Sequence, residues 1–196
     1  MSAKPHPNFV GVVYHTSENW HRKIPPTPDK PLRYAEVGVL HGANLISVAL
    51  TYGRHERSTF AAIDPWEDYQ EYPEYKGQQQ ENYRMFLTNI RECGIAHKTW
   101  VHREHSRIAF PKLERNFHDI IYIDGNHEPE AVLEDGVLAF RCLKPGGWLI
   151  FDDYGWGGPD LTQRGIDAFL SGYHKRLCEV ELIGSQMFAR KKEYTA

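Results

Sequence analysis

Two apolar runs that end in carboxylates constrain the fold of this chain more than any other feature of its sequence. The run "DIIYID" ends at Asp124, and the run "WLIFDD" ends at Asp152 and Asp153. The uninterrupted apolar centre of the first run indicates a strand that is buried on both faces, as in a parallel sheet. Because α/β sheets bind ligands beyond the carboxyl ends of their strands, these acids are candidate functional residues.

Strand-like and helix-like segments alternate along most of the chain. "RYAEVGV", "STFAAID" and "KTWVHR" are further β-type runs, and the segments between strands repeat apolar residues at helical spacing. Leu45, Ala49 and Tyr52 in "ANLISVALTYG" show that spacing. The last two β-type runs, "CEVELIG" and "SQMFARK", are close enough in the chain to pair antiparallel. The pattern predicts a doubly wound α/β fold, with a mostly parallel seven-stranded sheet and an antiparallel C-terminal hairpin.

Length and composition are those of one ordinary globular domain. The chain has 196 residues, of which 41% are hydrophobic and 25% charged, and its net charge is −3. This charge gives no electrostatic reason to expect a nucleic-acid partner, and no segment approaches the ~20 apolar residues of a membrane span. The first residues contain no secretory apolar region, and three isolated cysteines without CxxC spacing indicate a reducing compartment. We expect a cytoplasmic protein with an N-terminal arm at 1–31 and a domain at 32–196.

A short glycine turn follows the first predicted strand. In "EVGVLHG", Gly38 and Gly42 precede a helix, and glycine there permits positive φ and the close approach of a ligand. The turn lacks the middle glycine of the G-x-G-x-x-G dinucleotide fingerprint, and a tight turn without a ligand explains it equally well. Asp64 ends the second predicted strand, where an acid can bind ribose hydroxyls or simply cap a loop.

The acids that end the two central strands have the chemistry of a metal site. Three carboxylates without cysteine, from Asp124, Asp152 and Asp153, suit Mg²⁺ or another hard divalent cation. His127 follows Asp124 by three residues and has the pKa range of a general base toward a metal-bound hydroxyl. The structural alternative is that the paired acids cap a loop and the histidine begins a helix.

The motifs "EVGVLHG", "AAIDPW", "DIIYIDGNH" and "LKPGGWLIFDDY", in this order, resemble class I S-adenosylmethionine (SAM)-dependent methyltransferases. They are most similar to the metal-dependent O-methyltransferases that act on sugars of macrolides and related products. The resemblance implies that the metal ligands are Asp124, Asp152 and Asp153 and that the general base is His127. Many relatives carry an aspartate where this chain has Asn126, which cannot take a proton. For the cofactor, the implied contacts are Glu36, Gly38, Gly42, Asp64, His105 and Ser106.

Aromatic residues close to the strand ends are candidates for the acceptor side. Tyr154 and Trp156 lie in the glycine-rich loop that follows the paired acids. The insert at 65–80 could stack on a sugar or on adenine and act as a lid, as could the arm, or it could be a packed surface flap. Its aromatic residues are Trp66, Tyr69, Tyr72 and Tyr75.

The sequence therefore predicts an enzyme that transfers a methyl group from SAM to a hydroxyl of a sugar or another vicinal diol. The acceptor would be a small molecule or a glycan, with neither a nucleic acid nor a membrane as partner, and a homo-oligomer stays open. An alternative of the same fold methylates a catechol or a polyketide phenol. The missing middle glycine disfavours a nicotinamide-dependent oxidoreductase. The intact acids and His127 disfavour a non-catalytic, methyltransferase-like binding subunit.

Overall fold

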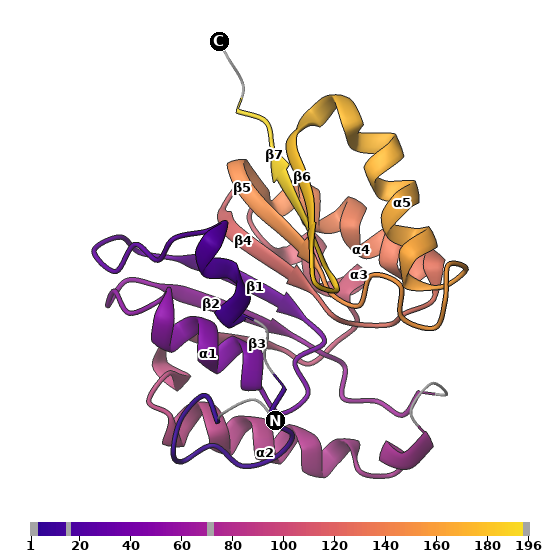
Figure 1. Ribbon diagram of the computed structural model, residues 1–196. Coiled ribbons are helices and arrows are strands. Elements are labelled where there is room, and N and C mark those ends of the chain that lie inside the picture. The colour runs from indigo at the N-terminus through magenta and orange to yellow at the C-terminus, as the bar shows by residue number, and fades with distance from the viewer. Residues whose placement is uncertain (1–3, 15–16, 70–72, 194–196) are drawn as a thin grey trace. The chain divides into compact units, whose positions relative to one another are not determined.

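The computed structural model describes residues 4–14, 17–69 and 73–193 (Figure 1). Its seven strands form one mixed sheet in the order β3-β2-β1-β4-β5-β7-β6. The strands are β1 (Arg33–Val37), β2 (Thr59–Ile63), β3 (Thr99–His102), β4 (His118–Ile123), β5 (Leu143–Phe151), β6 (Leu177–Ile183) and β7 (Gln186–Lys191). The observed pairings are parallel from β1 through β4 to β5 and antiparallel among β5, β7 and β6. This order confirms the predicted mostly parallel sheet with an antiparallel C-terminal hairpin.

Contacts divide the chain into two compact units. The first unit comprises residues 1–32 and 39–104, and the second comprises residues 33–38 and 105–196. None of the helices in the described ranges is long and apolar enough to cross a membrane.

The first unit contains the parallel pair β2 and β3 together with α1 (Ala43–Thr51) and α2 (Gln79–Glu92). Leu45, Ala49 and Tyr52 are buried, as their helical spacing predicts. The helix α2 buries Phe86 and Ile90 on its apolar side.

The N-terminal arm is built into the first unit. Phe9 and Trp20 are fully buried, and Trp20 lies in the 3₁₀ helix η1 (Ser17–Arg22). The Asn89 side chain on α2 accepts a hydrogen bond from Val10 N at 3.0 Å and donates one to Val10 O at 2.8 Å. A buried amide that serves both backbone groups of one residue fixes that segment firmly. The arm therefore packs through aromatic side chains and paired backbone groups, and its predicted action as a lid stays a prediction. The predicted boundary at residue 31 stays a prediction.

The second unit contains β1, β4, β5, β6 and β7 with the helices α3 (Ser106–Ala109), α4 (Pro129–Cys142) and α5 (Thr162–Tyr173). α4 and α5 lie side by side (Figure 1) because small residues allow close packing. A Cβ added at Gly165 of α5 would lie 2.5 Å from the carbonyl oxygen of Pro129, at the start of α4. Aromatic rings of Phe140, Phe151 and Phe169 fill the space between these helices and the sheet.

The fifth strand begins earlier than its apolar run indicates. The segment "LKPGG" reads as a turn, yet β5 starts at Leu143, which pairs with His118. The register shifts between His118 and Ile120, and Gly146 has a φ of 77°. Such an irregularity lets a strand continue through glycines that would otherwise end it. The carboxyl end of β5, which carries the predicted metal acids, lies where the sequence placed it.

A buried lysine closes the carboxyl end of α4. The Nζ atom of Lys191 on β7 donates to the carbonyl oxygens of Phe140 and Leu143 and to the side chain of Asn116. The last carbonyls of a helix lack partners within the helix, so they can accept hydrogen bonds from an ammonium group. The positive charge also interacts favourably with the negative end of the helix dipole. Burial, followed by the charge of Arg176, lowers the pKa of Lys191 to about 8.

Candidate functional site

The predicted acids lie at the carboxyl ends of strands. Glu36 is the fourth residue of β1, and Asp64, Asp124 and Asp152 directly follow β2, β4 and β5. Asp64 belongs to the first unit and the other acids to the second. The prediction that all of them line one crevice stays a prediction.

Three of the predicted residues come together in the second unit. Asp124, His127 and Asp153 each offer one ligand atom, and these three atoms lie within 4.8 Å of one another. They form the group of candidate metal ligands found in the described residues. His127 Nε2 is 3.2 Å from Asp153 Oδ2. The imidazole is buried and the two carboxylates are half-buried. Two carboxylate oxygens and an imidazole nitrogen are a donor set that can hold a divalent cation.

An indole ring holds the imidazole of His127 in place. The Trp156 ring stacks on it with 4.5 Å between centroids and 29° between planes. Trp156 lies in a loop whose glycines 155, 157 and 158 all have positive φ, and the residue is 37% exposed. The neighbouring Tyr154 directs its hydroxyl to Asp167 at 3.1 Å. That these two aromatic residues line the acceptor stays a prediction.

The carboxylate of Asp152 lies in a hydrogen-bonded pocket of its own. Its Oδ1 accepts bonds from Asp153 N at 2.9 Å and from Ser185 Oγ at 3.4 Å, and its Oδ2 accepts one from the Tyr122 hydroxyl. Asp152 is 2% exposed, and this burial raises the pKa of its carboxyl, with the Tyr122 hydroxyl opposing the rise. Asp152 is not a member of the three-residue group, and its predicted role as a metal ligand stays a prediction.

Asp64 organises the glycine turn of the first unit. Its Oδ2 accepts hydrogen bonds from the backbone N–H groups of Val39 and Leu40 at 3.0 and 2.9 Å. Its Oδ1 accepts the N–H of Trp66 at 2.7 Å. Leu40 and Trp66 both have positive φ, near 47° and 46°, so the carboxylate stabilises two strained backbone positions. The ribose contact predicted for Asp64 stays a prediction beside this structural role.

The two glycines of the turn are required by close packing. Gly38 has a φ of 79°, and a Cβ added there would lie 1.7 Å from the carbonyl oxygen of Asp124. Gly42, with a φ of 84°, precedes α1, and a Cβ added there would lie 3.0 Å from the Phe86 ring. Glu36 is buried and accepts a hydrogen bond from the Tyr34 hydroxyl at 2.5 Å. Their predicted contacts with a cofactor stay predictions.

His105 and Ser106 lie at the start of α3, where Ser106 contacts a buried acid that the sequence did not reveal. His105 is the residue before the helix, and Ser106 forms a side-chain hydrogen bond with Asp135 of α4. Burial raises the pKa of Asp135 to about 7, the bond from Ser106 opposes this rise, and the charge of Glu134 adds to it. The sequence signal that could have revealed Asp135 is its position three residues after Val132, on a helix face that is otherwise apolar.

Trp66 is part of the core of the first unit. Only 2% of it is exposed, its ring packs 4.8 Å from Tyr83 and 5.0 Å from Phe86, and its indole N–H donates to Leu40 O at 2.9 Å. Its predicted contact with an acceptor stays a prediction. Of the other aromatic residues in the insert, Tyr69 is exposed, and Tyr72 lies outside the described residues.

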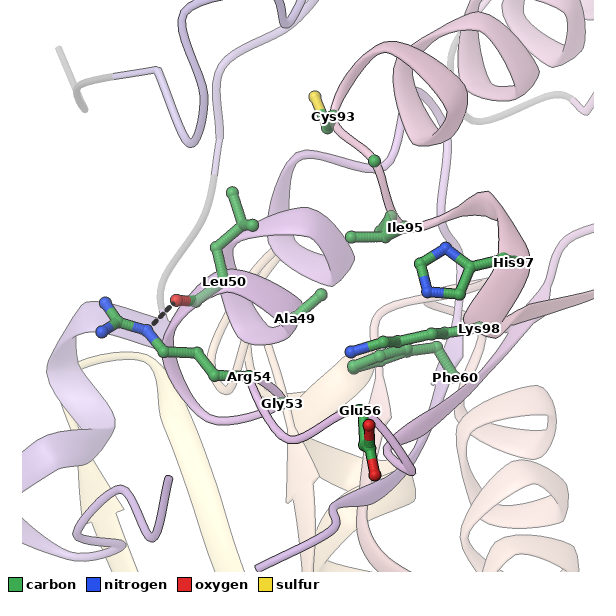
Figure 2. Close-up of a pocket in the computed structure, with 11 residues that line it drawn as sticks. Ala49, Leu50, Gly53, Arg54, Glu56, Phe60, Cys93, Ile95, His97 and Lys98 are labelled. Carbon is green, nitrogen blue, oxygen red and sulfur yellow. Dashed lines mark hydrogen bonds between the residues drawn. The ribbon is translucent and has the colours of Figure 1, made fainter. Parts of the chain in front are cut away.

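A surface hollow of about 360 Å³ lies elsewhere in the first unit (Figure 2). Phe60 at the start of β2 and Lys98 just before β3 line it, so it opens at the amino ends of these parallel strands. Asp64 follows the opposite, carboxyl end of β2. None of the predicted site residues lines the hollow, which is bounded by Ala49, Leu50, Gly53, Arg54, Glu56, Phe60, Cys93, Gly94, Ile95, His97 and Lys98.

Comparison with known proteins gives the family. The family described as "Methyltransferase domain" matches residues 35–154, more than half of the chain and all of the strand ends described above. The chain belongs to this methyltransferase family. A curated relative of this methyltransferase domain, the uncharacterized protein R132 of Acanthamoeba polyphaga mimivirus, is 28% identical over 153 residues. The match covers 75% of the chain and 63% of R132, so the chain spans less than two thirds of that relative.

Solved structures share the fold of this methyltransferase domain. The O-methyltransferase TomG from Streptomyces achromogenes, involved in tomaymycin synthesis and solved in complex with SAM, has a TM-score of 0.63 and 18% identity. That match covers 82% of this chain and 73% of TomG. An O-methyltransferase from Bacillus cereus, solved in complex with SAH, has a TM-score of 0.61 and 17% identity, with 82% and 74% covered.

Proposed function

We propose that this chain transfers the methyl group of SAM to a hydroxyl of a sugar or another vicinal diol, in a small molecule or a glycan. Its membership of the methyltransferase family supports methyl transfer. The SAM-bound and SAH-bound O-methyltransferases of the same fold support the donor and an oxygen acceptor. The observation that carries the proposal is the group of Asp124, His127 and Asp153 beyond the strand ends of a methyltransferase domain.

The residues of this group fit a divalent cation such as Mg²⁺. Asp124 and Asp153 each offer a carboxylate oxygen within 4.8 Å of the other ligand atoms, and hard cations prefer such oxygens. When bound, the metal would supply Lewis acidity that lowers the pKa of an acceptor hydroxyl and would orient two vicinal oxygens.

His127 is the proposed general base. Its Nε2 points toward Asp153, and the Trp156 ring limits how the imidazole can turn. In the reaction, the unprotonated ring nitrogen of His127 takes the hydroxyl proton while the acceptor oxygen forms a bond to the methyl carbon. The bond between that carbon and the SAM sulfur breaks, and SAH leaves. The Asp153 carboxylate stabilises the resulting imidazolium, because opposite charges at this separation attract strongly when partly buried.

For the donor, we propose contacts by the residues that the sequence motifs indicate. In the second unit these are Glu36, Gly38, His105 and Ser106, and in the first they are Gly42 and Asp64. Asp64→Asn keeps one side-chain oxygen for the turn amides and removes the charge, so it disturbs the glycine turn less than Asp64→Ala. We expect calorimetry with SAH to show about tenfold weaker binding to Asp64→Asn. Glu56→Gln in the surface hollow is the matched control.

The direct test measures transfer of a radiolabelled methyl group from SAM to vicinal diols. His127→Asn should lower the turnover rate about 100-fold or more while the Kd for SAH changes little. His97→Asn, which removes a histidine of the surface hollow, should behave as the wild type. An unchanged rate in His127→Asn would reject the base. If SAH does not bind to the wild type, methyl transfer itself is rejected.

A catechol or phenol is the second candidate acceptor, and Trp156 favours it. The residue is 37% exposed beside the three-residue group, and its indole ring offers a flat surface on which an aromatic acceptor can stack. Assaying catechols and sugar diols side by side decides between the classes. Trp156→Ala should weaken the binding of an aromatic acceptor more than the binding of a sugar.

A further inference from the structure

We infer that Asp152 is a positioning residue and does not ligate the metal. Its carboxylate fixes the backbone of Asp153 so that the Asp153 side chain faces Asp124 and His127. The inference rests on the metal site of the proposed function and assigns different tasks to two adjacent acids that the sequence treats alike.

The first support is the set of hydrogen bonds that the Asp152 carboxylate accepts. Both oxygens are engaged within the fold, Oδ1 by Asp153 N and Ser185 Oγ and Oδ2 by the Tyr122 hydroxyl. The residue is 2% exposed, whereas the Asp153 side chain is 23% exposed. The buried acid of the pair therefore makes its hydrogen bonds within the fold, whereas the more exposed acid belongs to the three-residue group.

The second support is the backbone of Asp153, which has a φ of 57°. A residue other than glycine in this left-handed region costs about 1 kcal/mol or more, so surrounding contacts must hold it there. The hydrogen bond from Asp153 N to Asp152 Oδ1, at 2.9 Å, is such a contact. This conformation turns the Asp153 carboxylate to within 3.2 Å of His127 Nε2.

The third support is a surrounding shell that holds Asp152 itself. The Gln186 side chain donates to the Tyr122 hydroxyl at 3.1 Å, and Asp152 N donates to Ile123 O at 2.9 Å. Tyr154 N, just beyond the acids, donates to Ser185 O at 2.8 Å. Asp152 is thereby joined to the carboxyl end of β4 and to the turn before β7. Partners of this kind orient ligands, and their removal weakens metal binding without removing a donor atom.

The experiment measures Mn²⁺ binding by calorimetry and by electron paramagnetic resonance, neither of which depends on turnover. Asp153→Asn and Asp124→Asn should each raise the Mn²⁺ Kd about tenfold or more, because each loses a charged ligand. Asp152→Asn keeps an oxygen for the Asp153 N–H and should raise the Kd less than about threefold. Asp152→Ala removes that oxygen and should weaken binding about tenfold or more, so that the asparagine variant rescues the alanine variant.

Tyr122→Phe provides a variant that cannot remove a metal ligand. It leaves both acids in place but frees Oδ2 of Asp152, and it should weaken Mn²⁺ binding measurably. This variant still tests the inference if Asp152→Ala fails to fold. If Asp152→Asn weakens binding as much as Asp153→Asn, Asp152 is a ligand and the inference is overturned. If the wild type does not bind Mn²⁺, the metal site of the proposed function fails first and the inference fails with it.

Discussion

Replacing Asp135 with asparagine should change how the stability of the protein depends on pH. Burial on α4 raises the pKa of this carboxyl from its ordinary 3.8 to about 7. Between these two pH values the folded protein keeps the proton and the unfolded chain releases it. The unfolded state therefore binds fewer protons, and the free energy of unfolding falls as pH rises through this window. The contribution is most favourable below pH 4 and is lost once pH exceeds about 7.

The magnitude follows from the size of the pKa difference. Each unit corresponds to about 1.4 kcal/mol, so the full difference corresponds to about 4 kcal/mol. Between pH 5 and pH 8, the wild type should lose about 3 kcal/mol that Asp135→Asn does not lose, since asparagine does not titrate. The amide can still pair with the Ser106 hydroxyl, so the variant should fold.

Urea denaturation of both proteins at pH 5 and at pH 8 measures this quantity as a difference of differences. Effects of all other titrating groups cancel when they are common to both proteins. Asp160→Asn, whose side chain is 84% exposed, is the control and should follow the wild type at both pH values. Parallel pH profiles for the wild type and Asp135→Asn would refute the reasoning, because the carboxyl would then titrate alike in the folded and unfolded states.

Three further changes test other features of the structure. Gly38→Ala should lower the free energy of unfolding by about 3 kcal/mol or more, measured in urea, because its Cβ would meet the Asp124 carbonyl at 1.7 Å; a small change would contradict this close approach. Asn89→Ala should cost about 2–3 kcal/mol and speed proteolysis near Val10, since it removes the partner of the buried His41 carbonyl and of the partly buried backbone groups of Val10; unchanged proteolysis would show that the arm is held otherwise. Relative to Lys191→Met, the wild type should gain stability in thermal melts between pH 8 and pH 10, because the folded pKa of about 8 lies below the unfolded value of 10.5; equal gains would argue against the lowered pKa.

The sequence predicts those parts of the fold that depend on apolar periodicity. The run ending at Asp124 and the helical spacing of Leu45 and Ala49 lead to the observed elements because burial decides both. Contacts between distant segments leave no such local signal. The arm shows this, since Phe9 and Trp20 are buried and the backbone of Val10 bonds to Asn89, far along the chain.

The candidate site was predictable to the level of strand ends and residue types. Asp124, His127 and Asp153 could be chosen because carboxylates and a histidine follow buried strands. The separate environment of Asp152 could not be foreseen, since the hydroxyl that binds it comes from Tyr122, which reads as an ordinary core residue within β4. Likewise, no residue pattern around Asp64 indicates that its carboxylate accepts the N–H of Val39 in the glycine turn. Side-chain direction at the end of a strand depends on partners that only the folded chain supplies.

The stacking of Trp156 on His127 gives the protein an intrinsic optical probe of its own site. Indole emission responds to an adjacent imidazolium and to the polarity of its surroundings, so movement of either ring changes the fluorescence. Trp156→Phe removes this emitter and leaves the four other tryptophans as background. Subtracting the two spectra would follow, in real time and without a label, whatever ion or acceptor enters beside the histidine.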